Sequence, residues 1–369
     1  RYFNFFFLNS NIDRSNMSSD TVINGSLIKD KDGSKLKSDS VEDKSSHLNS
    51  GSGENEGDKK KVTKLYSRPS FKKDKIDAHY DRWIPFSYFT FFLGDYSIAE
   101  RGGRRIQFVR QWRLWKHFAD FFPAKIIKTC DYDPKKNYIF GYHPHGILSA
   151  GGFVHFATEG TGFSKLFPGL KPHLLVLGGH FLLPLYRDFF LSGGAVSASR
   201  KSISYLLGNG HQGRALALVV GGAPESLDCH PDKVTLHLSK RKGFCKLALL
   251  HGASLVPTFS FGENSVYEQY PNPPGTRLRT IQDALQKVIG LAPCIFIGRG
   301  IFQYSFGIVP FRKPINTVFG APIDVQKVEN PTSEQICALH KTYVDAVVKL
   351  YNDYKDQFAE FPQTPINIV

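Results

Sequence analysis

Two histidines flank a proline at the point where an apolar run ends. Residues 138–142 have the pattern of a buried strand, and the chain continues His143-Pro144-His145-Gly146. Proline fixes φ and glycine frees the backbone, so a tight turn here would hold two imidazoles at a strand end. A reaction that removes a proton from a hydroxyl needs a base of near-neutral pKa, and histidine is the usual choice. Either histidine could serve, with backbone N–H groups near Gly146 facing the developing negative charge.

Two other interpretations of this turn stay open. A His-x-His pair can ligate a metal, but no clear third and fourth ligand lies nearby in the sequence, so we expect no metal. Two histidines can also simply support a turn. The sequence lacks the G-x-S-x-G elbow, the Walker A loop, the G-x-G-x-x-G fingerprint and H-E-x-x-H. The five cysteines lack C-x-x-C spacing, so we interpret them as reduced thiols facing the cytosol: Cys130, Cys229, Cys245, Cys294 and Cys337.

A second candidate site follows another apolar run. Residues 215–220 have the pattern of a strand and end in Gly221-Gly222, and Glu225 comes three residues later. This carboxylate could orient a histidine, or form an ion pair with an arginine or a substrate amine. The alternative interpretation is a polar turn with a carboxylate at the start of a helix.

Basic residues in three places could meet an anionic substrate. Residues 240–242 (Lys-Arg-Lys) precede a predicted helix start, where cations and backbone N–H groups make a cradle that the phosphates of a substrate would fit. A solvated charge run is the alternative. Arg187-Asp188 could be a partly buried ion pair or a phosphate contact. Arg299 lies between two glycines in an apolar stretch, where a charge needs a partner or an anionic ligand.

The elements that would position these groups alternate along the chain. We predict strands over residues 138–142, 173–177, 215–220 and 253–259, and helices from residue 147 and over 202–207, 243–251, 277–289 and 332–354. Strands that alternate with helices predict an α/β domain, a central sheet flanked by helices. Hydrophobic residues make up 41% of the chain, which is enough for a substantial core.

The first 62 residues differ from the rest in composition. They are rich in Ser, Asn, Asp, Lys and Gly and carry as many acidic as basic side chains, so the whole net charge of +14 lies in residues 63–369. We predict a disordered tail over 1–62, a linker with a short membrane-associating segment over 63–100, and one folded domain over 101–369. The chain starts at Arg1 and its only methionine is Met17, so we expect either a fragment or a native start at Met17.

A short hydrophobic segment, residues 83–94, precedes this domain. A spanning helix needs about 20 apolar residues, so we interpret this segment as an interfacial or re-entrant anchor, with a buried strand or helix as the alternative. Residues 289–311 are longer, but Arg299, glycines and prolines interrupt them. Aromatic residues are 14% of the chain, which together with the basic charge suits attachment to a membrane surface, with a large soluble core as the alternative interpretation. No signature of a nucleic-acid-binding fold is present, so we expect no nucleic acid partner.

Nine short segments, in order over about residues 95–350, carry a further signal. They are Gly102-Gly103-Arg104-Arg105, Trp115-Lys116-His117-Phe118, His143-Pro144-His145-Gly146, residues 161–170 (TGFSKLFPGL), Tyr186-Arg187-Asp188, residues 221–226 (GGAPES), Arg241-Lys242-Gly243-Phe244, residues 259–264 (FSFGEN) and residues 299–307 (RGIFQYSFG). Together they resemble the diacylglycerol acyltransferase type-2 family, which also contains monoacylglycerol and wax-alcohol acyltransferases.

The resemblance implies a fold like that of the glycerolipid acyltransferases. It implies an enzyme of the endoplasmic reticulum membrane, on its cytosolic face, and of lipid droplets, which esterifies diacylglycerol with acyl-CoA to form triacylglycerol. Its partners would be acyl-CoA, a neutral lipid acceptor and the membrane surface; no cofactor is expected, and a homo-oligomer stays open. The alternatives are a monoacylglycerol or long-chain alcohol acceptor, and a lipid-droplet protein that has lost catalysis.

One departure affects the assignment of the catalytic residues. In related glycerolipid acyltransferases the base belongs to a His-x-x-x-x-Asp motif, whereas Leu148 and Ala150 stand five residues after His143 and His145. We expect the orienting acid to be Glu225, with Asp188 as the second choice. The expected catalytic residues are His145, His143 and Glu225, and the expected substrate-binding residues are Gly146, Arg187, Asp188, Gly221, Gly222, Arg241, Lys242, Gly243, Phe244, Glu263, Asn264 and Arg299.

Overall fold

The computed structural model describes residues 95–183, 185–208 and 210–369. The predicted tail over 1–62 and the hydrophobic segment 83–94 lie outside the described residues. The division of the chain into tail, linker and folded domain therefore stays a prediction.

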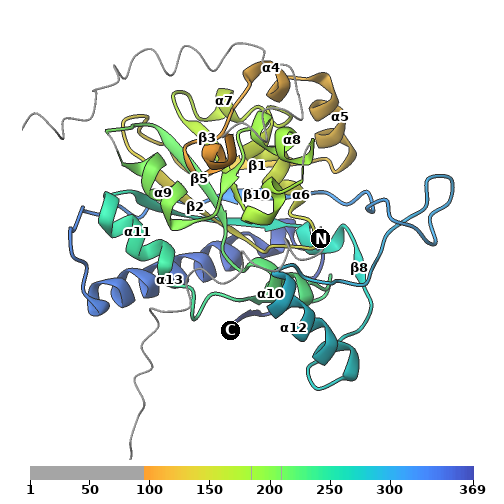
Figure 1. Cartoon of the computed structure of the whole chain (residues 1–369). Helices are drawn as coiled ribbons and strands as arrows, with labels where there is room; N and C mark the ends of the chain where they lie inside the picture. Colours follow the sequence, from red (N-terminus) through yellow and green to blue (C-terminus); the bar gives the residue numbers. More distant parts are fainter. Residues whose placement is uncertain (1–94, 184, 209) are drawn as a thin grey trace, which may run out of the picture. The chain divides into compact units, whose positions relative to one another are not determined.

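A seven-stranded mixed sheet forms the centre of the described part (Figure 1). Its strands are β1 (Lys125–Lys128), β2 (Tyr138–His143), β3 (Lys171–Val176), β4 (Val196–Ser197), β5 (Arg214–Val219), β7 (Ser254–Phe261) and β10 (Asn316–Phe319). Their order is β1-β10-β7-β2-β5-β3-β4, and every neighbouring pair is parallel except β10 with β7. Two smaller sheets pair β6 (Val234–Leu236) with β11 (Ile366–Ile368) and β8 (Glu268–Gln269) with β9 (Phe296–Ile297). The predicted α/β class and flanking helices are confirmed.

Helices alternate with these strands along the chain. They are η2 (Asp95–Glu100), α4 (Gln107–Arg110), α5 (Arg113–Phe121), α6 (Ala150–Gly152), η3 (Phe153–Ala157), α7 (Phe163–Leu166), η4 (Gly178–Phe181), α8 (Tyr186–Ser192), α9 (Arg200–Leu207), α10 (Gly222–Leu227), α11 (Gly243–His251), η5 (Glu263–Ser265), α12 (Arg277–Ile289) and α13 (Ser333–Phe358).

The central strand β2 is buried along its whole length and divides two hydrophobic cores. Successive side chains of a strand point to opposite faces. Ile139 accordingly packs in the core that α9, α11 and α13 cover, whereas Phe140 and Tyr142 pack in the core that η3, α7 and α8 cover. Figure 1 shows α11 and α13 side by side beneath the sheet. Burial on both faces explains why this strand reads as a continuous apolar run.

Several predicted elements agree with the structure to within a few residues. Helices α11 and α12 have the predicted bounds, and β2, β3, β5 and β7 begin or end one or two residues from the predicted limits. The helix expected from residue 147 begins at Ala150 instead, because residues after Gly146 first complete the turn. Helix α13 begins one residue later than predicted, after Thr332, whose side chain and that of Gln335 form a capping box.

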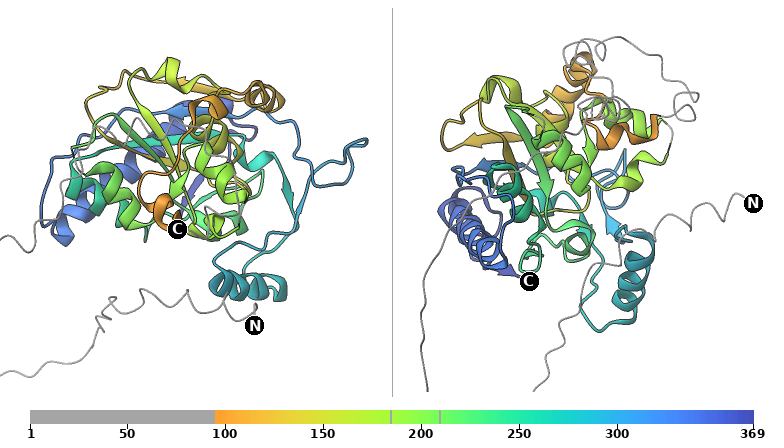
Figure 2. Two further views of the ribbon diagram at one scale, coloured as in Figure 1. Left: turned by 45° about the horizontal axis from the view of Figure 1, so that its top comes forward. Right: turned by 60° about the vertical axis from the view of Figure 1, so that its left-hand side comes forward.

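Part of the apolar stripe of helix α12 faces the solvent, whereas such a stripe is usually buried. Ile281 and Leu285 are 58% and 42% exposed, whereas Gln282 is buried and donates a hydrogen bond to the carbonyl of Pro293. The periodicity correctly predicts a helix, but the buried contacts of α12 are polar. The helix lies apart from the central sheet (Figure 2).

The close approach of β2 and α13 at Gly141 predicts that a larger residue at this position destabilises the fold. A Cβ on Gly141 would lie 1.7 Å from the Tyr343 hydroxyl oxygen, which donates a hydrogen bond to the Gly141 carbonyl. We expect Gly141→Ala to lower the free energy of unfolding by about 1–3 kcal/mol, because an extra methyl group in a packed core forces its neighbours apart. Thermal unfolding of the purified chain measures this. Gly243→Ala is the control, because no heavy atom lies within 4 Å of the added group; equal melting temperatures for the two variants would contradict the prediction.

Candidate active site

The two predicted sites meet at one edge of the sheet. Strand β2 lies between β5 and β7, both parallel to it, and Tyr142 stands opposite Val219 and Thr258. The chain therefore leaves β2 and β5 at the same edge, where the connections pass to opposite sides of the sheet. Such a switch point at the carboxyl ends of parallel strands is the usual place for a ligand site. The turn 143–146 and the start of α10 lie side by side there.

The first histidine of the turn, His143, belongs to the core. Its side chain is fully buried, and its Nε2 lies 3.0 Å from the hydroxyl oxygen of Tyr343. That hydroxyl donates its hydrogen to the Gly141 carbonyl, so the contact with His143 is an N–H donated by the imidazole. Burial lowers the pKa of His143 to about 3. His143 is thus neutral at physiological pH and holds β2 against α13.

The second histidine, His145, is partly exposed. Its Nδ1 lies 2.8 Å from the hydroxyl oxygen of Ser226 and 3.0 Å from the carbonyl oxygen of Gly146. Among the described residues, no hydrogen-bond partner meets its Nε2. Burial lowers its pKa, and the nearby His180 lowers it further. This ring is neutral, held on one side, and available as a base on the other.

Glu225 binds the backbone of the histidine turn and does not contact the imidazole ring of His145. Its buried carboxylate accepts a hydrogen bond from the backbone N–H of His145 (2.6 Å) and one from that of His237 (2.8 Å). Burial raises the pKa of Glu225 to about 7, against the lowering effect of these two hydrogen bonds. Glu225, which the sequence predicts to orient a histidine, therefore lies next to His145, but it binds the backbone of His145. The side chain that contacts the imidazole ring is Ser226.

A network of polar and charged side chains surrounds His237, whose backbone N–H binds Glu225. His237 Nε2 lies 2.6 Å from an Asp228 carboxylate oxygen, and Arg279 of α12 donates to the other oxygen. Burial would raise the pKa of Asp228, but the hydrogen bonds from His237 and Arg279 outweigh it and lower the pKa to about 2. The network ties α12 to the end of α10.

A second buried carboxyl lies beneath the turn. Glu263 accepts hydrogen bonds from the Tyr142 hydroxyl (2.7 Å) and the Gly151 N–H (3.0 Å). Gly146 has a φ of +65°, and a Cβ there would lie 2.7 Å from Glu263 Cγ, so a larger residue would be both strained and crowded. Burial raises the pKa of Glu263 to about 7. The structure places this expected substrate-binding residue inside the protein, under Gly146.

Part of the predicted anion cradle also reaches this edge. Gly221 and Gly222 begin α10 beside Glu225, and the Arg241 guanidinium donates to the Gly221 carbonyl at 3.5 Å. Lys242 is exposed and caps α11, whose first residue is Gly243. Phe244 is buried instead, with its ring 4.9 Å from that of Tyr343.

Other expected substrate-binding residues have protein partners of their own. Asp188 on α8 forms ion pairs with Arg187 (3.3 Å) and with Arg104 (3.5 Å), so the predicted partly buried ion pair is present. Asn264 donates to the Lys233 carbonyl. The Arg299 guanidinium lies over the rings of Phe121 and Tyr304, 5.4 and 5.0 Å from their centroids. Within the part of the chain that the structure describes, none of Asp188, Asn264 and Arg299 forms a hydrogen bond with His145.

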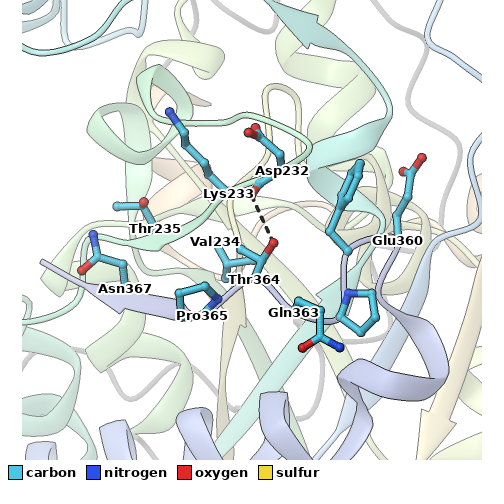
Figure 3. Close-up of a pocket in the computed structure, with 11 residues that line it drawn as sticks. Asp232, Lys233, Val234, Thr235, Glu360, Gln363, Thr364, Pro365 and Asn367 are labelled. Carbon is cyan, nitrogen blue, oxygen red and sulfur yellow. Dashed lines mark hydrogen bonds between the residues drawn. The ribbon is translucent and has the colours of Figure 1, made fainter.

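Two pockets lie between β6 and the C-terminal segment, and the smaller of them reaches the turn. The larger, of about 670 Å³, is shown in Figure 3, where the Thr364 hydroxyl donates to the Asp232 carbonyl across it. The smaller, of about 40 Å³, includes Pro144 in its wall. The two share the lining residues Lys233, Val234, Glu360, Phe361 and Thr364. The larger pocket thus continues toward the histidine turn, although His145 itself lines neither of the two.

Comparison with known proteins gives this geometry a chemical context. The family described as diacylglycerol acyltransferase matches residues 80–368. The chain belongs to the diacylglycerol acyltransferase family. It is 49% identical over 280 residues to 2-acylglycerol O-acyltransferase 1 of Bos taurus (76% of this chain, 84% of the relative) and to diacylglycerol O-acyltransferase 2 of Danio rerio (75% and 78%). It is 48% identical over 288 residues to diacylglycerol O-acyltransferase 2 of Homo sapiens (78% and 74%). No solved structure matches the chain.

The family resemblance expected from the sequence is therefore confirmed, and the enzyme is an acyltransferase of this family. Sequence reasoning missed three residues around its histidine turn. Ser226 follows Glu225 directly, and His180 follows β3, the next parallel strand beyond β5. The position of His180 just after a third parallel strand could have predicted that it lies near the other two strand ends. Tyr343 gave none, since it contacts His143 across 200 positions of sequence.

The buried carboxyl of Glu263 makes stability depend on pH. Its pKa rises from 4.5 to about 7 on folding, so its protonated form stabilises the fold below pH 4.5, and this contribution is lost as the pH rises through 7. Glu263→Gln keeps an acceptor for Tyr142 and Gly151 but cannot ionise. We expect its free energy of unfolding, relative to wild type, to rise by up to about 3 kcal/mol between pH 4.5 and 8.

Denaturant unfolding at several pH values tests this expectation, with the exposed Glu268→Gln as the matched control. The difference between Glu268→Gln and wild type should not change with pH. A difference between Glu263→Gln and wild type that is equally flat would show that Glu263 is ionised in the folded enzyme throughout.

Proposed function

We propose that this enzyme transfers a fatty acyl group from acyl-CoA to the free hydroxyl of diacylglycerol and forms triacylglycerol at the endoplasmic reticulum membrane. The observation that carries the chemistry is His145, whose ring is held at Nδ1 and free at Nε2 at a strand end. Diacylglycerol O-acyltransferases are among the relatives of which this chain covers three quarters or more. The alternative acceptor is a monoacylglycerol, because a 2-acylglycerol O-acyltransferase is equally similar. A long-chain alcohol is a further one.

In this proposal His145 Nε2 takes the proton of the acceptor hydroxyl, whose oxygen then attacks the thioester carbonyl carbon. Backbone N–H groups near Gly146 or at the start of α10 face the oxyanion of the tetrahedral intermediate. Collapse of the intermediate breaks the C–S bond, and the CoA thiolate takes from His145 the proton that the acceptor hydroxyl lost. Glu225 takes part by holding the backbone N–H of His145.

The basic residues beside this turn suit the phosphates of acyl-CoA. Lys240, Arg241 and Lys242 are exposed, and helix α11 begins directly after them. Arg241 already contacts Gly221, which places positive charge at the same edge of the sheet as His145. A helix start flanked by cations is a favourable place for phosphate oxygens.

His145→Ala tests the proposed base. We expect it to lower triacylglycerol formation from labelled acyl-CoA by roughly 100- to 10,000-fold, the usual contribution of a general base, while expression and membrane association persist. His251→Ala is the control, because His251 is a partly exposed histidine that contacts Ser204 elsewhere in the fold. Wild-type turnover by His145→Ala would refute the proposal. Parallel assays with diacylglycerol, monoacylglycerol and alcohol acceptors decide the acceptor, and no acyl transfer to any of them would favour a binding protein.

A group of exposed apolar side chains supports the membrane part of the proposal. Phe302 is 98% exposed, and Ile301, Tyr304, Phe306 and Ile308 are also largely exposed. Between Asp283 and Asp324 the chain has four basic residues and no acidic one. Aromatic rings with basic neighbours favour the headgroup region of an anionic membrane. No helix in the described ranges is long and apolar enough to cross a membrane.

Phe302→Ser tests whether this apolar segment contacts the membrane. Withdrawal of one phenyl ring from lipid costs about 1.5–3 kcal/mol, so we expect the full chain to bind vesicles with anionic lipid about ten- to a hundredfold more weakly. Vesicle co-flotation measures the binding. Tyr205→Ser, at a partly exposed ring on α9, is the control. Unchanged binding of Phe302→Ser would mean that the attachment depends on another part of the chain, such as residues 83–94.

A further inference from the structure

The contacts at His145 favour one of the two neutral tautomers of its ring. Nδ1 lies 3.0 Å from the Gly146 carbonyl oxygen, and a carbonyl oxygen can only accept. Nδ1 therefore donates, and the lone pair of the neutral ring is on Nε2. The Ser226 hydroxyl oxygen, 2.8 Å from the same Nδ1, then accepts the shared hydrogen and does not donate its own.

Helix α10 holds His145 at two points. The Glu225 carboxylate accepts from the backbone N–H of His145 at 2.6 Å, and the next residue, Ser226, contacts the ring. Both residues are only 2% exposed, so water does not compete for either contact. A group that fixes the tautomer and orientation of a catalytic imidazole is what an activated base requires.

We propose that Ser226 is a positioning residue for the base. It keeps His145 in the tautomer with the hydrogen on Nδ1, so that Nε2 takes the proton of the acceptor hydroxyl. This inference rests on the proposed function. Ser226 itself loses no proton and forms no bond to the acyl group: the hydroxyl proton passes to Nε2, the acceptor oxygen bonds to the acyl carbon, the C–S bond breaks, and the thiolate takes the proton from Nε2.

A serine beside a histidine is also the arrangement of an activated nucleophile. Two observations favour the positioning role. The Ser226 oxygen is buried, and the ring nitrogen that it meets also faces the Gly146 carbonyl; in the tautomer that donates to this carbonyl, Nδ1 has no lone pair to accept the serine proton. A nucleophile would acquire a covalently bound acyl group, which the test below detects.

The experiment compares Ser226→Ala and Ser226→Thr with wild type in membranes that contain the full chain. Loss of the hydroxyl should lower kcat by roughly tenfold to a hundredfold with little change in KM for acyl-CoA, because the ring loses its orientation and the substrate keeps its contacts. Ser226→Thr retains a hydroxyl and should recover most of kcat. Ser202→Ala is the matched control, since Ser202 is a fully buried helical serine that donates to the Ala99 carbonyl.

The outcomes separate this inference from the proposed function. Wild-type kcat in Ser226→Ala, together with an inactive His145→Ala, would refute the role of Ser226 alone. An active His145→Ala would refute the base itself. Labelled acyl group on Ser226 in a quenched reaction would show a nucleophile and overturn the positioning role. Should Ser226→Ala not accumulate, Ser226→Cys replaces it, because a thiol of similar size is a weak acceptor and should lower kcat in the same direction.

Discussion

The parallel pairing of β2 with β5 is the constraint on which the candidate active site depends. Because both strands run in one direction, the turn after Tyr142 and the helix after Val219 leave the sheet at the same edge. This register brings Ser226 within 2.8 Å of a histidine 81 positions earlier in the sequence. Strand β7, parallel to β2 on its other side, ends near Glu263 and closes the site from below. A shift of β5 by one residue would turn its side chains to the opposite face and separate these groups.

Two buried carboxyls hold the histidine turn in place, and both do so at a cost to stability. Glu225 holds the backbone above the sheet, and Glu263 lies beneath Gly146. Burial raises the pKa of each to about 7, which means that desolvation outweighs the hydrogen bonds they accept. Ionisation of either carboxyl therefore lowers the stability of the fold, although each carboxyl satisfies hydrogen-bond donors inside the protein. Destabilising buried carboxyls are expected where the precise position of a functional group matters more than the stability of the fold.

The sequence predicts the elements better than it predicts the contacts. Apolar runs and glycines place β2 and β5 within a residue or two, and hence bring His145 and Glu225 together. They do not reveal which atoms meet, because a carboxylate can accept from a ring or from a backbone N–H at the same strand end. The burial of His143 depends on Tyr343 from α13, a contact between positions 200 apart that no local pattern encodes. For α12, periodicity reveals an apolar stripe but not the direction in which it points.

The neutral environment of the His145 ring suits the leaving group of this reaction. Where a carboxylate contacts Nδ1, it stabilises the imidazolium and raises its pKa. Here Nδ1 meets a hydroxyl and a carbonyl, and burial lowers the pKa of His145. The imidazole stays neutral and able to accept a proton, and the imidazolium, once formed, releases it readily. A thiol has a pKa of about 8.5, so a thiolate departs with little help from an acid, whereas the acceptor alcohol needs a base to attack. In the proposed mechanism, a well-oriented base with no carboxylate on its ring therefore assists the attack of the alcohol, which is the harder half of the reaction.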